Sequence, residues 1–279
     1  MPAHDSRSPR VARMITSLQN EQVKAIRALD MRKVRRETEL FVAEGVSILA
    51  SARERGIVPE TLVMLAGAAE AGMAVTLAGW ALEAGADVLE VSPPVMAKIA
   101  ARDNPQTMLG VFRQRFAAPP DAAAVGANAT WVALEEIRDP GNLGTIVRTV
   151  DAVGAAGVIL VGTCCDPYAR EAVRATMGSI FAVPLARMTG EEFLSWRARW
   201  PGDVIGTHLA AQDDMRRVTY REPVLLMMGG EGPGLSPALA DAATRLVKIP
   251  MAGRLDSLNL AVATALTLYQ IRSPHLSLS

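Results

Sequence analysis

The hydrophobic residues of the first hundred positions gather in short runs, separated by segments with helical spacing. Four runs have the length and composition of strands, and two of the segments have the spacing of helices. Strands are predicted at residues 40–43, 61–65, 87–91 and 108–113, and helices at residues 46–55 and 95–101. Residues 66–86 are rich in Ala and Gly and show no clear period. The pattern predicts a small α/β domain over residues 14–115.

The second half of the chain continues this alternation with more strongly apolar runs. Strands are predicted at residues 131–134, 158–161, 180–183, 204–206 and 224–228, and a further one ends near residues 249–251. Helices are predicted at residues 141–153, 168–177, 191–199 and 257–272. Strands joined by crossover helices favour a mostly parallel sheet that is buried on both faces. We therefore expect a second α/β domain over residues 130–279.

Two segments show neither the spacing of a strand nor that of a helix. Residues 1–13 are small, polar and basic and contain two prolines, which predicts a disordered basic arm. Residues 116–129 read FAAPPDAAAVGANA, and their prolines, small residues and single charge predict a linker between the domains.

The N-terminal segment also carries the only strong charge imbalance. Residues 1–36 hold nine Lys or Arg and three acidic residues, a local net charge of +6, whereas the whole chain has a formal net charge of zero. A helix is expected after Ser17 as N-cap, with Val23, Ile26 and Val34 on one face. The opposite face carries Lys24, Arg27, Arg35 and Arg36. Such a face is either a solvated surface or a site for phosphates.

Composition narrows the class of protein further. Half of the residues are hydrophobic and 21% are charged, which is typical of a globular protein. The only cysteines are the neighbours Cys164 and Cys165, which excludes a disulfide framework and favours a reducing compartment. The three histidines are too scattered for a metal site. No apolar run reaches the ~20 residues that span a bilayer, and no signal-peptide core opens the chain. These features predict a cytoplasmic protein without membrane or metal partners.

The first candidate for chemistry follows the strand at residues 131–134. Pro140-Gly141 makes a turn, a helix starts at Asn142, and Arg148 lies under two turns further on. Taken alone, Asn142 is an ordinary helix cap and Arg148 an ordinary surface charge.

Two further candidates lie near the C-terminus. Residues 229–234 read GGEGPG, and glycines at this density allow close approach of a backbone to a ligand or simply a tight turn. Neither a dinucleotide fingerprint nor a P-loop is present, and Glu231 would repel a phosphate. Residues 249–253 read IPMAG, and Ser257 then offers an N-cap to an apolar helix.

Together, the three stretches resemble the motifs of the SpoU/TrmH family of SPOUT RNA 2′-O-methyltransferases. The resemblance rests on residues 142–149 (NLGTIVRT), 228–235 (MGGEGPGL), 249–251 (IPM) and 257–263 (SLNLAVA). It covers about residues 130–272, with Leu260-Ala261 where the family often has Val-Ser. Residues 41–45 (FVAEG) are similar to the substrate-binding domain that often precedes this one.

The resemblance implies a fold, a cofactor and a set of site residues. The C-terminal domain is expected to contain a deep trefoil knot that binds S-adenosyl-L-methionine, and the chain to form a homodimer. The implied cofactor-binding residues are Gly229, Ile249, Met251 and Leu258, with Thr207 beside them. The implied catalytic residues are Asn142, Arg148, Glu231, Ser257 and Asn259.

The family also implies roles for these residues. Arg148 is the family's catalytic arginine, but a guanidinium group stays protonated, so we expect it to stabilise charge rather than to remove a proton. Asn142 would orient Arg148 or the ribose, Glu231 could anchor Arg148, and Ser257 and Asn259 would shape the third motif.

We therefore expect methyl transfer to a ribose 2′-hydroxyl of structured RNA, with ribosomal RNA first and transfer RNA second. The N-terminal domain would capture the RNA and the linker would act as a hinge. Two alternatives stay open, namely methylation of a base nitrogen and a non-catalytic RNA-binding or ribosome-assembly factor on the same fold.

Overall fold

The computed structural model describes residues 13–68, 72–100 and 105–278. They form two units, of which the first takes in the chain up to Gln114 together with Tyr168–Phe181. The second takes in Arg115–Pro167 and the chain from Ala182 onward. Residues 1–12, most of the predicted disordered arm, lie outside the described residues.

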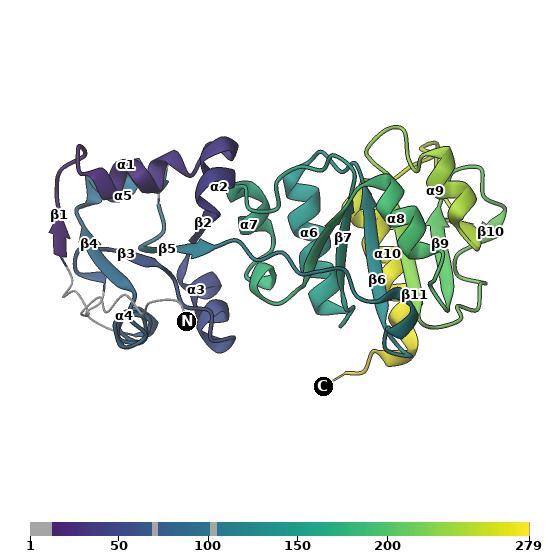
Figure 1. Ribbon diagram of the computed structural model, residues 1–279, viewed down its shortest axis with the longest axis horizontal. Coiled ribbons are helices and arrows are strands. Elements are labelled where there is room, and N and C mark those ends of the chain that lie inside the picture. The colour runs from purple at the N-terminus through teal and green to yellow at the C-terminus, as the bar shows by residue number, and fades with distance from the viewer. Residues whose placement is uncertain (1–12, 69–71, 101–104, 279) are drawn as a thin grey trace. The chain divides into compact units, whose positions relative to one another are not determined.

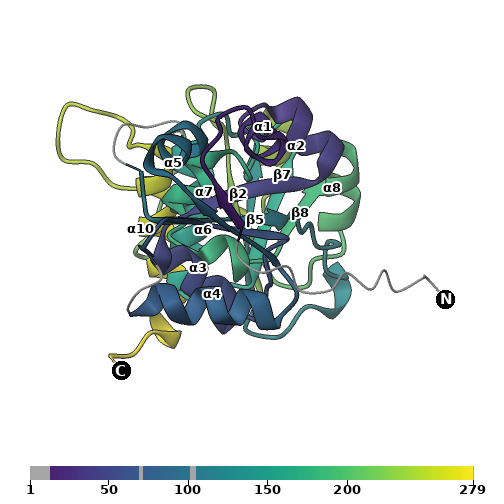
Figure 2. The ribbon, with the colours of Figure 1, turned by 90° about the vertical axis from the view of Figure 1, so that its left-hand side faces the viewer.

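A five-stranded mixed sheet forms the centre of the first unit, in the order β1-β4-β3-β5-β2. Its strands are β1 (Arg13–Ile15), β2 (Leu40–Glu44), β3 (Thr61–Leu65), β4 (Asp87–Val91) and β5 (Met108–Arg113). One face is covered by α1 (Glu21–Ala28) and α5 (Pro93–Ala100), and the other by α3 (Val46–Glu54) and α4 (Met73–Glu83) (Figures 1 and 2). The sequence predicted four of these strands but not the three-residue β1, nor α4.

The basic N-terminal segment forms two helices, α1 and α2 (Arg32–Thr38). Asn20 caps α1, because its side chain accepts hydrogen bonds from the backbone N–H groups of Gln22 and Val23. The prediction of Ser17 as N-cap is therefore wrong.

Arg35 also differs from its prediction as a solvent-facing cation. It is buried, and Nη1 donates to the carbonyl oxygens of Leu29 (2.7 Å) and Asp30 (2.9 Å). These carbonyls follow the last turn of α1, where a cation satisfies acceptors that have no partner within the helix. Arg35 therefore holds the break between α1 and α2.

Residues 168–181 build part of the first unit's core. The ring of Phe41 lies 4.7 Å from that of Tyr168, and Phe112 lies 4.7 Å from Phe181, between ring centroids. α7 (Arg170–Ala175) crosses β2, where Arg174 Nη2 donates to Glu44 Oε2 at 2.6 Å. A strand was predicted at residues 180–183, but the chain instead forms a 3-10 turn at Ser179–Phe181. The prediction fails because Phe181 faces a partner far away in the sequence.

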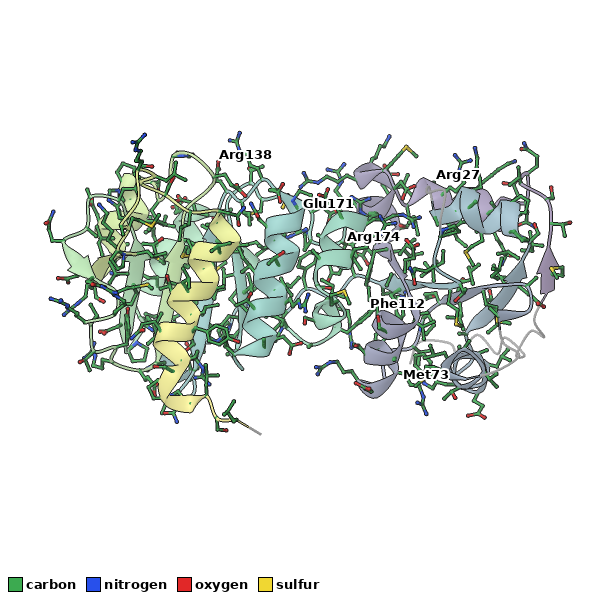
Figure 3. The ribbon with its side chains drawn as sticks, turned by 180° about the vertical axis from the view of Figure 1, so that it is seen from behind. Arg27, Met73, Phe112, Arg138, Glu171 and Arg174 are labelled. Carbon is green, nitrogen blue, oxygen red and sulfur yellow. The ribbon has the colours of Figure 1, made fainter. Side chains whose placement is uncertain are left out.

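The second unit contains a parallel seven-stranded sheet in the order β10-β12-β9-β11-β6-β7-β8. Its strands are β6 (Thr130–Glu135), β7 (Gly157–Val161), β8 (Leu185–Met188), β9 (Asp203–Thr207), β10 (Asp213–Asp214), β11 (Val224–Met228) and β12 (Arg245–Lys248). One face is covered by α8 (Gly190–Arg197) and α9 (Pro237–Ala242). The other is covered by α6 (Pro140–Ala152) and α10 (Leu260–Arg272), which lie side by side in Figure 3. This confirms the predicted α/β fold with a parallel sheet.

The predicted linker, residues 116–129, packs against the second unit. Ala117 N–H donates to the Leu185 carbonyl oxygen at 2.8 Å, and Trp196 Nε1 donates to the Pro120 carbonyl oxygen at 2.7 Å. Ala122 is fully buried. Hydrogen bonds and apolar contacts therefore hold this segment against the second unit.

Candidate functional site

A cavity of about 680 Å³ lies at the carboxyl ends of β9, β11 and β12. The carboxyl ends of parallel strands are where α/β sheets commonly bind ligands. All five residues predicted to bind the cofactor line this cavity, namely Thr207, Gly229, Ile249, Met251 and Leu258. Three of the predicted catalytic residues line it as well, namely Glu231, Ser257 and Asn259.

The glycine-rich loop after β11 forms one wall of the cavity. Gly234 N–H donates to the Gly230 carbonyl oxygen at 3.1 Å, and Gly232 and Gly234 have positive φ angles of 96° and 71°. A Cβ atom on Gly229 would lie 1.9 Å from the carbonyl carbon of Gly234. The loop thus needs glycine in order to fold back on itself. It is both a tight turn and part of the cavity wall.

Side chains from all three motifs meet at the edge of the cavity. Asn259 Nδ2 donates to Asn142 Oδ1 at 2.9 Å, and Asn142 Nδ2 donates to Glu231 Oε1 at 3.1 Å. The second oxygen of Glu231 accepts from the backbone N–H of Arg138 at 3.1 Å. The amide of Asn142 therefore joins the first, second and third motifs.

These hydrogen bonds also set the charge of Glu231. Partial burial disfavours its ionised form, but donation from the Asn142 side chain and from backbone N–H groups outweighs burial and lowers the pKa of Glu231. The carboxylate stays ionised and acts as an acceptor in the network.

Helix caps place two of these residues. Asp139 caps α6 by accepting from Asn142 N–H at 2.6 Å, so Asn142 itself is in the first turn and its side chain is available to the network. Asn259 caps α10, because its Oδ1 accepts from Ala261 and Val262 N–H. The reading of Asn142 as an ordinary cap therefore does not hold, and the prediction of Ser257 as the N-cap of α10 is wrong. Ser257 lies in the exposed loop before α10.

Comparisons with known proteins bear directly on this arrangement. Residues 129–269 match the SpoU rRNA Methylase family, and residues 20–110 match the MRM3-like substrate binding domain. The chain belongs to the SpoU rRNA methylase family. Both matches confirm the resemblance that the sequence motifs carry.

Individual SpoU relatives match along almost the whole chain. The structure of an AdoMet-bound rRNA methyltransferase from Sinorhizobium meliloti is 45% identical with a TM-score of 0.86, and the match covers 95% of this chain and 99% of that one. The 23S rRNA (guanosine(2553)-2′-O)-methyltransferase RlmP of Bacillus subtilis is 28% identical over 93% of this chain and 99% of its own. A 23S rRNA (uridine(2479)-2′-O)-methyltransferase of Streptomyces viridochromogenes is 30% identical over 93% of this chain and 91% of its own.

Arg148, which the resemblance implied as a catalytic residue, is not among the residues that line the cavity of its own chain. It is exposed on α6, and its side chain has no hydrogen-bond or ion-pair partner among the described residues. Glu231 bonds to Asn142 and to the backbone at Arg138, and not to Arg148 as the sequence suggested. The structure therefore brings together four of the five predicted catalytic residues and leaves Arg148 outside them.

Three contributors to this SpoU site were missed by sequence reasoning. Asp139 caps α6, Arg138 contributes its backbone N–H, and Lys248 lines the cavity at the end of β12. Only Lys248 had a usable signal, because it is a charged residue at the carboxyl end of an apolar strand. The first two depend on how the loop after β6 meets the glycine-rich loop.

The surroundings of the two cysteines disfavour the ionised form of their thiols. Burial raises the pKa of the Cys164 thiol, and burial together with nearby acidic groups raises the pKa of Cys165 to about 12. In the described part of the chain, no group of three or more His, Cys, Asp or Glu side chains is placed to hold a metal ion. No helix there is long and apolar enough to cross a membrane.

Proposed function

We propose that this chain transfers a methyl group from S-adenosyl-L-methionine to a ribose 2′-hydroxyl of ribosomal RNA. The observation that carries this proposal is the hydrogen-bonded series Asn259–Asn142–Glu231 beside the cavity. It joins the three family motifs at one point. Both characterised relatives described above are named as 23S rRNA 2′-O-methyltransferases.

The cavity fits the cofactor in size and character. Its volume of about 680 Å³ falls within the ~300–1,000 Å³ that is usual for small-molecule sites. Gly229, Ile249 and Leu258 would hold the cofactor largely through backbone groups, and Met251 and Thr207 would contact it from the sides. When bound, S-adenosyl-L-methionine supplies a methyl carbon on a positively charged sulfur. An apolar wall favours loss of that charge during transfer.

Arg148 would act on the acceptor. A guanidinium group beside the reacting hydroxyl stabilises negative charge as it develops on the oxygen, and it can also hold a neighbouring phosphate. The 2′-oxygen would form its bond to the methyl carbon as the carbon–sulfur bond breaks and its electrons stay on sulfur, which leaves as neutral S-adenosyl-L-homocysteine, and the hydroxyl proton would pass to water. Asn142, Glu231 and Asn259 would keep the surrounding loops in the reactive arrangement.

A homodimer would complete the site. The outer face of α10 exposes Val262 (48%), Leu266 (43%) and Tyr269 (52%), while its inner face is buried. An exposed apolar stripe on a helix is typical of a protein interface. Because Arg148 does not line its own cavity, a second chain would bring its Arg148 to the cofactor. The predicted trefoil knot belongs to this part of the proposal, since in the family it forms the cofactor pocket.

The first unit would capture the RNA. After Arg35 is removed from the predicted set, exposed cations remain on α1 and α2, namely Lys24, Arg27, Arg32, Lys33 and Arg36. Figure 3 shows Arg27 on the outer side of α1. Cations on a surface gain affinity for RNA from contact with phosphates. The reaction on ribosomal RNA would place the protein in the cytoplasm.

Maps of 2′-O-methylation in RNA from cells with and without the gene test this proposal. We expect one ribosomal position to lose its methyl group in the deletion strain, and to regain it with the unaltered gene but not with Arg148→Ala. Loss at a transfer RNA position instead would reassign the substrate. If all 2′-O-methyl positions persist, the non-catalytic alternative is favoured.

A further inference from the structure

The cavity has one permanent positive charge, and the proposed mechanism does not use it. Among the described residues that line the cavity, Lys248 is the only Lys or Arg. Lys248 is the last residue of β12, and it is half-buried. The end of β12 therefore places a lysine in the lining of the cavity.

The acidic residue beside Lys248 in the strand register is engaged by another side chain. Asp214 of β10 is its partner in the strand register, but both oxygens of Asp214 accept hydrogen bonds from Arg216. The Arg216 side chain also lowers the pKa of Asp214 to about 2. Arg245, on the same strand, pairs with Asp213 at 3.5 Å. No side-chain partner of Lys248 is found in the part of the chain that the structure describes.

The remaining ionisable groups of the cavity cannot take the place of this cation. Glu231 and Asp256 are acids, and Glu231 is engaged by Asn142 and the backbone at Arg138. His208 Nδ1 already accepts a hydrogen bond from Ala210 N–H at 3.2 Å. Lys248 is therefore the cation of the cavity lining that an anionic group of a ligand would contact.

S-adenosyl-L-methionine has one anionic group, the α-carboxylate of its methionine part. We propose that Lys248 binds this carboxylate and thereby makes the cavity select ligands that carry an intact amino-acid end. The inference deepens the proposed function and rests on it. A charge-assisted hydrogen bond in a partly buried site is stronger than a neutral one, and it is directional enough to orient the ligand.

Binding measured by calorimetry with two ligands tests this assignment without any turnover. S-adenosyl-L-methionine and its decarboxylated form both keep the sulfonium and the amine, and differ in the carboxylate. We expect the unaltered protein to bind the decarboxylated form about tenfold more weakly or worse, as is usual for loss of a charged hydrogen bond. Lys248→Met should lower affinity for S-adenosyl-L-methionine by the same factor and leave the decarboxylated form unaffected. Lys248→Arg, which keeps the charge, should retain most of the discrimination.

Arg245→Met is the matched control, because Arg245 lies on the same strand and outside the cavity lining. It should bind both ligands as the unaltered protein does. Equal losses for both ligands in Lys248→Met, or no loss for either, would overturn the inference while leaving the proposed function intact. Failure of the unaltered protein to bind S-adenosyl-L-methionine at all would reject the proposed function, and the inference with it.

Discussion

Replacing Asn142 by alanine removes the residue that joins the three motifs. The change deletes the donor to Glu231 and the acceptor for Asn259 in one step. Both bonds lie at the exposed edge of the cavity, so each contributes only about 0.5–1 kcal/mol to folding, as is usual for solvent-accessible polar pairs. We expect the free energy of unfolding to fall by ~1–2 kcal/mol and the melting temperature by roughly 2–8 °C.

The effect on methyl transfer should be much larger than the effect on folding. Catalysis depends on holding loops in a reactive arrangement, and small displacements cost about 10²-fold in rate. Asn142 does not line the cavity, so cofactor affinity should change less than about threefold, a shift of under ~0.7 kcal/mol. Single-turnover rates with labelled cofactor, calorimetry and thermal unfolding measure the three quantities. Thr145→Ala on the same helix leaves the network intact and is the control.

The pH dependence of folding gives an independent check. The pKa of Glu231 is lowered in the folded protein, so its stabilising contribution is present above its unfolded pKa and is lost as pH falls through its folded pKa. Without Asn142, burial is less opposed and the pKa of Glu231 should rise. The variant should then gain less stability than the unaltered protein as pH is raised from acid to neutral. A near-normal transfer rate, or an unchanged pKa of Glu231, would refute the role given to Asn142.

Four further predictions concern the site and the two units. Arg148→Ala should lower the transfer rate by roughly 10² or more with little change in cofactor affinity. Arg148→Lys should also be slow, because lysine lacks the planar, forked guanidinium group. Rapid transfer by the Ala variant would remove Arg148 from the mechanism. Leu266→Glu together with Tyr269→Glu should convert a dimer into a monomer in sedimentation, whereas unchanged mass would place the interface elsewhere. Arg27→Glu with Arg36→Glu should weaken RNA binding and reduce its salt dependence by about two contacts. Equal RNA affinity in this double variant would leave the first unit without the capture role. Arg35→Met should instead lower the melting temperature, because it leaves the carbonyl oxygens of Leu29 and Asp30 without their donor.

The sequence predicted the parallel sheet because its strands are continuous apolar runs separated by helices. It also pointed to the edge of the sheet where the cavity lies, since the strands predicted to end near Thr207, Met228 and Ile249 all bring those residues to its lining. Local patterns were enough for these features, because each depends on residues close together in the chain.

The predictions that were wrong share a different cause, which is contact between residues far apart in the sequence. Arg35 was predicted to face solvent, but its guanidinium group donates to the carbonyl oxygens of Leu29 and Asp30. Residues 180–183 had the composition of a strand, but Phe181 packs on Phe112. Likewise, Asn142 is a residue type that commonly caps helices. Its side chain is available to the network because Asp139 caps α6 instead.

The predicted hinge illustrates the same point. Residues 116–129 have a flexible composition, but Pro120, Ala122 and Ala117 are held by the second unit. Residues 168–181 join the first unit from within the sequence of the second, so the chain passes between the units three times. A shortened chain that tests the role of the first unit should therefore begin at Arg115, so that it keeps residues 116–129. It would still leave Tyr168 and Phe181 without their aromatic partners.

The most direct test of the central claim is the identity of the atom that receives the methyl group. Labelled S-adenosyl-L-methionine, the purified protein and the ribosomal RNA fragment identified by methylation mapping are incubated, and the RNA is digested to nucleosides. We expect the label to appear only in a 2′-O-methylated nucleoside and to disappear when the target nucleotide is supplied in its 2′-deoxy form. Label that persists on the 2′-deoxy fragment would contradict the account and assign the methyl group to a base.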